Sequence, residues 1–149
     1  MPFDFESDIH RAAAKGQLTS VQYLVEQYHT NVEARDMSGS TPLHLASSNG
    51  YIDIIKYLVE KCHANVEAED KDGWTPTFYA SFFGYIEVVK YFYEQCHANV
   101  NKEDDRGRSL LYFAAKYGHI KVVKYLIEHC RANARVRDNE GNTLLSVAS

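Results

Sequence analysis

The sequence lacks the long apolar runs and the leader segment that membrane and secreted proteins carry. No stretch approaches about 18 consecutive apolar residues, so we expect no membrane-spanning segment. The chain starts acidic, at residues 1–6, with no basic head before an apolar core, so we expect no secretory signal. Cysteine is scarce, and its odd number of three argues against a disulfide framework. These absences favour free thiols and an intracellular location, with the cytoplasm preferred over the nucleus.

Motifs of common enzyme classes are missing as well. The glycines stand singly and never cluster as a phosphate-binding loop or a dinucleotide fingerprint. Neither a G-x-S-x-G turn nor an H-E-x-x-H helix occurs. We therefore predict that the protein is not an enzyme, with no catalytic residue and no cofactor. The apolar fraction of 45% is that of an ordinary globular protein, which argues against disorder.

A 34-residue period runs through the chain. Four residue ladders keep this spacing: Gly39, Gly73, Gly107 and Gly141; Gly16, Gly50, Gly84 and Gly118; Tyr23, Tyr57, Tyr91 and Tyr125; and Cys62, Cys96 and Cys130. A fixed period of this length is the mark of a repeat architecture. The chain is therefore predicted to be a linear array of similar units.

Each unit has the same local signals in the same order. An Asp-x-x-Gly turn opens it, because glycine supplies the positive φ that a tight turn needs. Thr41-Pro42 and Thr75-Pro76 then mark a helix start, with threonine as cap and proline in the first turn. The pattern predicts a short helix of about two turns, a second amphipathic helix and an extended link. In the first unit the helices are expected at residues 7–15 and 18–28.

The segment Thr41-Pro42-Leu43-His44-Leu45-Ala46 closely resembles the T-P-L-H-x-A signature of the ankyrin repeat. The resemblance implies an all-α solenoid of stacked helix-turn-helix units with projecting β-hairpin-like turns. It covers one domain, residues 1–149, with units at about 4–35, 36–69, 70–103 and 104–137 and a partial unit at 138–149. The tetratricopeptide repeat also has this period, but its W-x₂-L-G-x₂-Y pattern is absent.

Departures from the family pattern carry expectations of their own. Phe78, Tyr112 and Ser146 replace the histidine at His44, which in the family ties adjacent repeats together. Aromatic packing is expected to compensate. The usual ankyrin period is 33, and the extra residue falls after the second helix, near the position of a family glycine. The partial unit stops one helix short, so we expect either a longer natural chain or packing of this end against another molecule.

Two recurring side-chain patterns favour packing over chemistry. The Cys-His pairs at Cys62-His63 and Cys96-His97 lie one repeat apart, and packed helices sit about 8–10 Å from one another. That spacing is too wide to share a metal ion or to close a disulfide. We therefore predict no metal site, and buried thiols at helix ends. The tyrosine ladder is predicted to pack beside the core of the second helices.

Candidate partner-binding residues cluster at the turn tips and at the ends of the first helices. In ankyrin-like proteins these positions line the concave groove and vary with the partner. The candidates are aromatic or basic: Trp74, Phe82, Phe83, Arg106, Arg108, Lys116 and Tyr117. Aromatic side chains and arginine are frequent binding hot spots. The alternative reading is that Phe82 or Phe83 fills the space of the missing histidine, and that the basic residues form a solvated face.

These residues predict a scaffold that binds a protein or peptide with apolar anchors and an acidic segment. Residues 104–137 hold eight basic against three acidic side chains, although the whole chain carries −4. Self-association through the partial unit is the second hypothesis, and nucleic-acid or anionic-ligand binding by the basic fourth unit is the third. The net negative charge argues against the third. Alanine at Trp74 and Phe83 is expected to weaken binding and to leave the fold intact.

Overall fold

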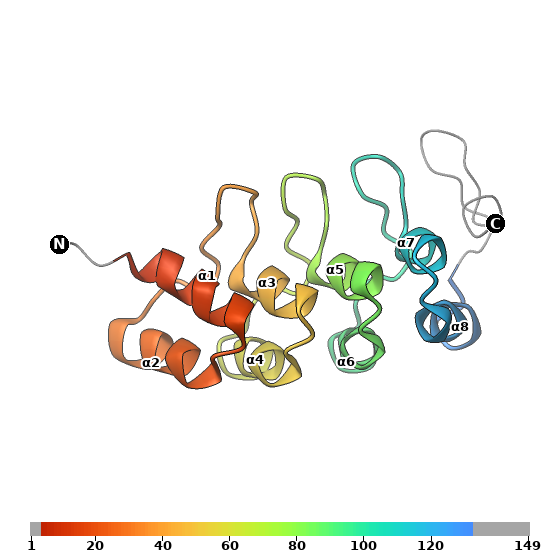
Figure 1. Ribbon diagram of the computed structural model, residues 1–149. Coiled ribbons are helices and arrows are strands. Elements are labelled where there is room, and N and C mark those ends of the chain that lie inside the picture. Colours follow the sequence, from red (N-terminus) through yellow and green to blue (C-terminus); the bar gives the residue numbers. More distant parts are fainter. Residues whose placement is uncertain (1–3, 133–149) are drawn as a thin grey trace.

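The computed structural model describes residues 4–132, which form a row of stacked helix pairs (Figure 1). The first helices of the pairs are α1 (Phe5–Lys15), α3 (Pro42–Ser48), α5 (Pro76–Phe83) and α7 (Leu110–Lys116). The second helices are α2 (Leu18–Tyr28), α4 (Ile52–Lys56), α6 (Ile86–Cys96) and α8 (Ile120–Glu128), with α4 continued by a π-helical turn, η1 (Tyr57–Lys61). The predicted all-α solenoid is confirmed.

The first and second helices form two layers, and the loops before α3, α5 and α7 project from one edge (Figure 1). Each loop closes as a turn: the N–H of Asp36, Asp70 and Asp104 donates to the carbonyl four residues on, at 2.9 Å. Neighbouring loops are also joined, because the N–H of Asp105 donates to the carbonyl of Asp72 at 3.1 Å. The loops therefore form a connected edge beside the first-helix layer.

His44 shows how one residue links adjacent units. Its ring is fully buried, and Nδ1 accepts a hydrogen bond from the N–H of Thr41 at 3.0 Å. Nε2 therefore carries the proton and donates to the carbonyl of Trp74 in the next unit at 2.8 Å. Burial lowers the pKa of this imidazole, which keeps the ring neutral. His10 makes the equivalent contact between Nε2 and the carbonyl of Ser40 at 3.0 Å.

The replacement of this histidine changes the third unit. Thr75 keeps the extended backbone conformation of a helix cap, but its side chain accepts no hydrogen bond from the helix, contrary to the sequence prediction. In the second unit the hydroxyl of Thr41 does accept one, from the N–H of His44. Phe78 offers no acceptor to complete such a box. It is instead fully buried, with its ring centroid 6.0 Å from that of Trp74 and 6.3 Å from that of Phe113. Aromatic packing thus replaces the polar link, as expected.

The second helices end in a left-handed residue that is not glycine. His29, His63, His97 and Arg131 have φ between 51° and 57°. The following N–H closes the helix end by bonding a carbonyl six residues back, as at Ala98 with Phe92 (3.0 Å). This is the place where the sequence departs from the family glycine. A side chain in this conformation costs about 1 kcal/mol relative to glycine.

Thr77 is a core residue whose replacement we expect to raise the stability of the fold. Its side chain is 1% exposed, and Oγ1 has no hydrogen-bond partner within the part of the chain that the structure describes. The equivalent positions in the neighbouring units are Leu43 and Leu111, both apolar and buried. Burying an unbonded hydroxyl costs about 1–3 kcal/mol.

We predict that Thr77→Val raises the free energy of unfolding by about 1 kcal/mol, because valine has nearly the same shape and no hydroxyl. Urea denaturation followed by circular dichroism measures this. Thr41→Val is the matched control, since the Thr41 hydroxyl is bonded to His44, and it should lose stability. A loss of stability in both variants would show that the Thr77 hydroxyl has a partner.

Candidate functional site

The candidate residues come from two adjacent units. Trp74 lies in the loop just before α5, and Phe82 and Phe83 form its last turn. Arg106 and Arg108 lie in the next loop, whereas Lys116 and Tyr117 lie at the end of α7. Because α5 and α7 pack side by side in the first-helix layer, the ends of the two helices lie together (Figure 1).

The rings form one continuous group, which we call the aromatic cluster: Trp74, Phe82, Phe83, Phe113 and Tyr117. The centroid of Phe82 lies 5.3 Å from that of Trp74, 4.9 Å from Phe83 and 4.5 Å from Tyr117. Trp74 also lies 4.8 Å from Phe113. These separations are in the range of favourable aromatic pairs. The cluster therefore crosses the boundary between the third and fourth units.

Exposure divides the cluster into an interior and a surface. Phe113 is buried, and Trp74 and Phe82 are half-buried. Phe83 and Tyr117 are each 47% exposed. Phe82 therefore packs within the protein, as the alternative reading allowed, and it supports two exposed rings on either side.

Trp74 and Arg108 are held by one carboxylate. The side chain of Asp104 is fully buried, and its Oδ2 accepts from Nε1 of Trp74 at 2.9 Å and from Nε of Arg108 at 3.0 Å. Its Oδ1 accepts from the N–H groups of Arg106 (3.0 Å) and Arg108 (2.8 Å). The guanidinium of Arg108 also lies 4.9 Å from the centroid of Phe113. Both candidates therefore stabilise the loop as well as facing the cluster.

This arrangement alters one expectation about Trp74. Its ring contacts four others, including Phe78 and Tyr79, and its N–H is bonded to a buried carboxylate. Alanine at Trp74 would remove these contacts, so it would change stability together with any binding. Phe83 and Tyr117 are better positions at which to test binding alone.

A basic side chain, that of Lys116, borders the cluster at the end of α7. Lys116 is exposed, and its Nζ lies 5.7 Å from the ring centroid of Tyr112 and 5.8 Å from that of Tyr117. Arg106 is exposed in the loop that Asp104 opens. Phe82, Phe83, Lys116 and Tyr117 thus share one surface.

Three aromatic residues next to the candidate residues were missed by sequence reasoning. Phe113 completes the cluster from within, and Tyr85 is 36% exposed with its ring 6.5 Å from Phe83. Tyr79 packs on Trp74, and its hydroxyl donates to Oδ2 of Asp70 at 2.5 Å; burial and this bond raise its pKa. The 34-residue register could have indicated Phe113 and Tyr79, because they occupy the same position in adjacent units.

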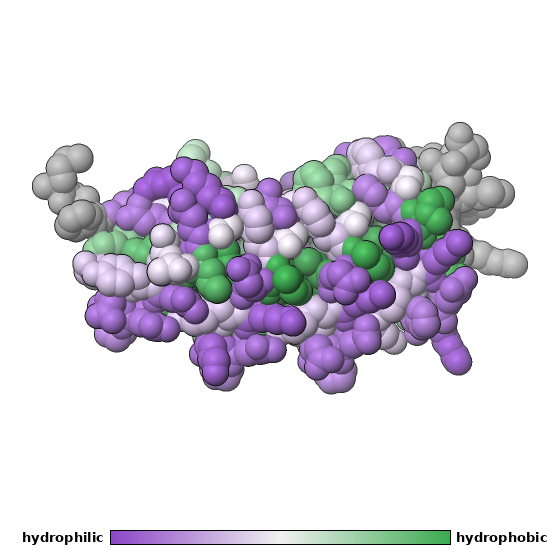
Figure 2. All heavy atoms as spheres, turned by 60° about the horizontal axis from the view of Figure 1, so that its bottom comes forward, coloured by the Kyte–Doolittle hydropathy of each residue, from purple (hydrophilic) through white to green (hydrophobic). Residues whose placement is uncertain are grey.

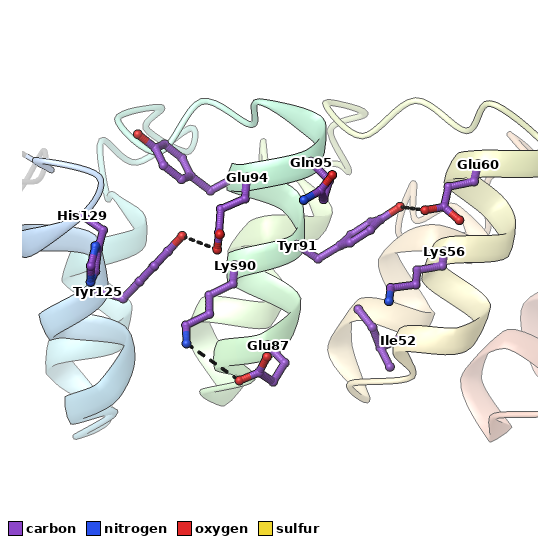
Figure 3. A pocket seen from close by; sticks show the side chains of 11 residues that line it. Ile52, Lys56, Glu60, Glu87, Lys90, Tyr91, Glu94, Gln95, Tyr125 and His129 are labelled. Atoms are coloured by element: carbon purple, nitrogen blue, oxygen red, sulfur yellow. Dashed lines mark hydrogen bonds and ion pairs between the residues drawn. The ribbon is translucent and has the colours of Figure 1, made fainter.

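The tyrosine ladder joins the second helices, as Figure 3 shows for two steps. The hydroxyls of Tyr57, Tyr91 and Tyr125 donate to Glu26, Glu60 and Glu94 of the preceding unit, at 3.1, 3.2 and 2.8 Å. Burial, aided by the carboxylate neighbours, raises the pKa of all three hydroxyls. An open groove of about 960 Å³ runs between the helices here, and Tyr91 and Tyr125 line it. These three tyrosines pack units together, as predicted, whereas Tyr23 at the start of the ladder is 55% exposed, contrary to the prediction.

The cysteines are free thiols with raised pKa values. Burial raises the pKa of Cys62 and Cys96, and burial together with Glu94 raises that of Cys130 to about 11. Nucleophilic cysteines need a lowered pKa. Among the described residues no group of three or more His, Cys, Asp or Glu side chains could hold a metal ion. Residues 4–132 also include no helix long and apolar enough to cross a bilayer.

Comparison with known proteins identifies the family of the chain. A family model described as ankyrin repeats (3 copies) matches residues 9–104 and 92–149. No curated protein matches the sequence. Ankyrin repeats generally mediate protein–protein interaction and are typically non-enzymatic. The repeat period, the stacked helix pairs and this match agree, and the chain belongs to the ankyrin-repeat family.

Proposed function

We propose that the protein is a non-catalytic scaffold that binds a protein or peptide on the surface of the aromatic cluster. The observation that carries this is the pair of rings at Phe83 and Tyr117, each 47% exposed and joined through Phe82. Large rings that stay in water next to one another are typical of a binding surface. In the second unit the positions of Phe82 and Phe83 are occupied by Ser48 and Asn49. The proposed contact is therefore confined to the third and fourth units.

The bordering charges favour a partner with an acidic segment beside its apolar anchors. Lys116 stands against Tyr117 and Arg106 lies in the neighbouring loop, whereas Arg108 is already paired with the buried Asp104. Apolar side chains of the partner would contact Phe83 and Tyr117, and its carboxylates would face Lys116. Matching charges of this kind orient a partner and speed association more than they add affinity.

Alanine at Phe83 is predicted to weaken partner binding about tenfold, and alanine at both Phe83 and Tyr117 about a hundredfold. Both side chains are half in water, so their loss should leave the fold unchanged. Affinity capture with mass spectrometry would identify the partner. Calorimetric titration of the purified partner would then give the dissociation constants of each variant.

Tyr28→Ala is the matched control, because Tyr28 is also 47% exposed but lies on α2 in the first unit. It should bind the partner like the unchanged protein. Equal weakening by Tyr28→Ala and Phe83→Ala would place the contact elsewhere. The ring centroid of the single tryptophan, Trp74, lies 5.3 Å from that of Phe82, so a partner that contacts the cluster should change its fluorescence.

The two alternatives receive unequal support. The partial unit at 138–149, together with Arg135 and Arg137 of the basic fourth unit, lies outside the described residues. Light scattering with and without residues 138–149 would test self-association through that unit. Nucleic-acid binding is weakened as a proposal because Arg108 is paired with the buried Asp104. The free thiols support an intracellular place of action.

A further inference from the structure

The second helices pack on one another through contacts that recur in register. The last three of them, α4, α6 and α8, each begin next to an aromatic or imidazole ring that lies on a glycine of the preceding unit. A Cβ at Gly16 would come within 2.8 Å of the Tyr51 ring, and one at Gly50 within 2.7 Å of the Tyr85 ring. His119 lies in the same way on Gly84. The glycine thus forms a seat for the ring of the next helix.

The second contact lies six residues further along the same helix. There a tyrosine donates to a glutamate of the preceding unit, as with Tyr91 and Glu60 (3.2 Å) or Tyr125 and Glu94 (2.8 Å). A lysine of the preceding helix also faces these two rings: Nζ of Lys56 lies 5.7 Å from the centroid of Tyr91, and Nζ of Lys90 lies 5.7 Å from that of Tyr125. Ring seat, tyrosine and lysine together fix the register between neighbouring helices; Figure 3 shows the tyrosines and lysines.

One sequence pattern supplies these contacts. Residues 51–57 read YIDIIKY, residues 85–91 read YIEVVKY and residues 119–125 read HIKVVKY. Each begins with the seated ring and ends with the tyrosine that reaches the glutamate. An aliphatic residue follows the ring at Ile52, Ile86 and Ile120, the first position of α4, α6 and α8. Figure 2 shows hydrophobic side chains recurring along this side of the stack.

The receiving half of this interface is exposed on α8. Ile120 is 62% exposed and Ile127 is 39% exposed, whereas their equivalents Ile86 and Tyr93 are less so. A Cβ at Gly118 would meet no atom of the described residues within 4 Å, so no ring among residues 4–132 lies on this glycine. Glu128 is exposed at the position of Glu26, Glu60 and Glu94, and no described tyrosine reaches it. We call Gly118, Ile120, Lys124, Ile127 and Glu128 the α8 face.

We propose that the α8 face binds an amphipathic helix of another protein, which continues the second-helix layer by one step. The helix would place an aromatic or imidazole ring on Gly118 and pack aliphatic side chains on Ile120 and Ile127. Its tyrosine, six residues after the ring, would face Lys124 and donate to Glu128. The contacts within the stack define this occupant, because each earlier second helix already receives such a helix.

A peptide of residues 85–98 with Cys96→Ser is a suitable probe, since it carries the full pattern. Fluorescence anisotropy of the labelled peptide should rise to saturation with the 149-residue protein. A helix of this length is marginal alone, so we expect a dissociation constant of tens to hundreds of micromolar. Ile127→Asp should weaken binding at least tenfold. Met37→Asp, at a loop residue 92% exposed, is the matched control and should change nothing.

A coupling measurement tests the register. Phenylalanine in place of Tyr91 in the peptide should weaken its binding to the unchanged protein about threefold. The same change should leave binding to the Glu128→Gln variant unaffected. Absence of saturable binding, or equal binding to Ile127→Asp, would overturn the proposal, and absence of coupling would overturn its register. Gly118 of the α8 face follows Tyr117 of the aromatic cluster, but Ile127 lies at the far end of α8, so Ile127→Asp should leave the Phe83-dependent partner untouched.

Discussion

Gly84→Ala should lower the free energy of unfolding by about 3 kcal/mol, because two penalties meet at this residue. Gly84 has φ of 79°, a conformation that costs a residue with a side chain about 1–2 kcal/mol. A Cβ would also lie 2.4 Å from Nδ1 of His119. That ring is tethered, since its Nε2 hydrogen-bonds to the carbonyl of Phe82 at 2.7 Å, so relieving the overlap adds about 1–3 kcal/mol. Urea denaturation followed by circular dichroism would measure the loss.

Gly118→Ala separates the two penalties. Gly118 has φ of 75°, but an added Cβ would meet no described atom within 4 Å. We therefore expect only the conformational cost, about 1 kcal/mol. Equal losses at Gly84 and Gly118 would show that His119 moves aside and that the ring seat contributes nothing to stability.

The comparison of these glycines shows which parts of the fold are readable from the sequence. The 34-residue period predicts both helix layers, and the left-handed glycines follow from the ends of the first helices. Whether a glycine is also in close contact depends on the residue 35 positions later, which is Tyr51 for Gly16 and His119 for Gly84. That contact exists only once adjacent units are stacked. The sequence pattern of a single unit therefore cannot predict it.

The sequence predicts which candidate residues lie together, but not which of them are buried and which are exposed. Position within the repeat correctly brings Phe82, Phe83 and Tyr117 together, because equivalent helix ends stack side by side. It does not distinguish a ring that packs inside from one that stays exposed, since Trp74 and Phe83 are both large aromatic residues. That distinction depends on Asp104, whose role as an acceptor for two side chains follows from three-dimensional geometry.

Replacing Asp104 with asparagine should lower stability by about 2–4 kcal/mol, although the two side chains have nearly the same shape. The amide oxygen can still accept from the N–H groups of Arg106 and Arg108. The amide nitrogen, however, would replace Oδ2 and turn its own hydrogens toward the N–H donors of Trp74 and Arg108. Two buried donors then lose their acceptor and Arg108 loses its counter-charge, which is costly in an interior site.

Asp36→Asn provides the control for this effect. Asp36 opens the equivalent loop of the second unit, where its Oδ1 accepts from the N–H groups of Ser38 and Ser40 at 2.9 Å. Asparagine preserves that role, so the loss should stay within about 0.5 kcal/mol. Trp74 fluorescence during urea denaturation follows Asp104→Asn most directly, because the indole itself loses its bond. If both variants lose the same small amount, the carboxylate of Asp104 acts only through the loop backbone, and Trp74 and Arg108 are held by their ring contacts.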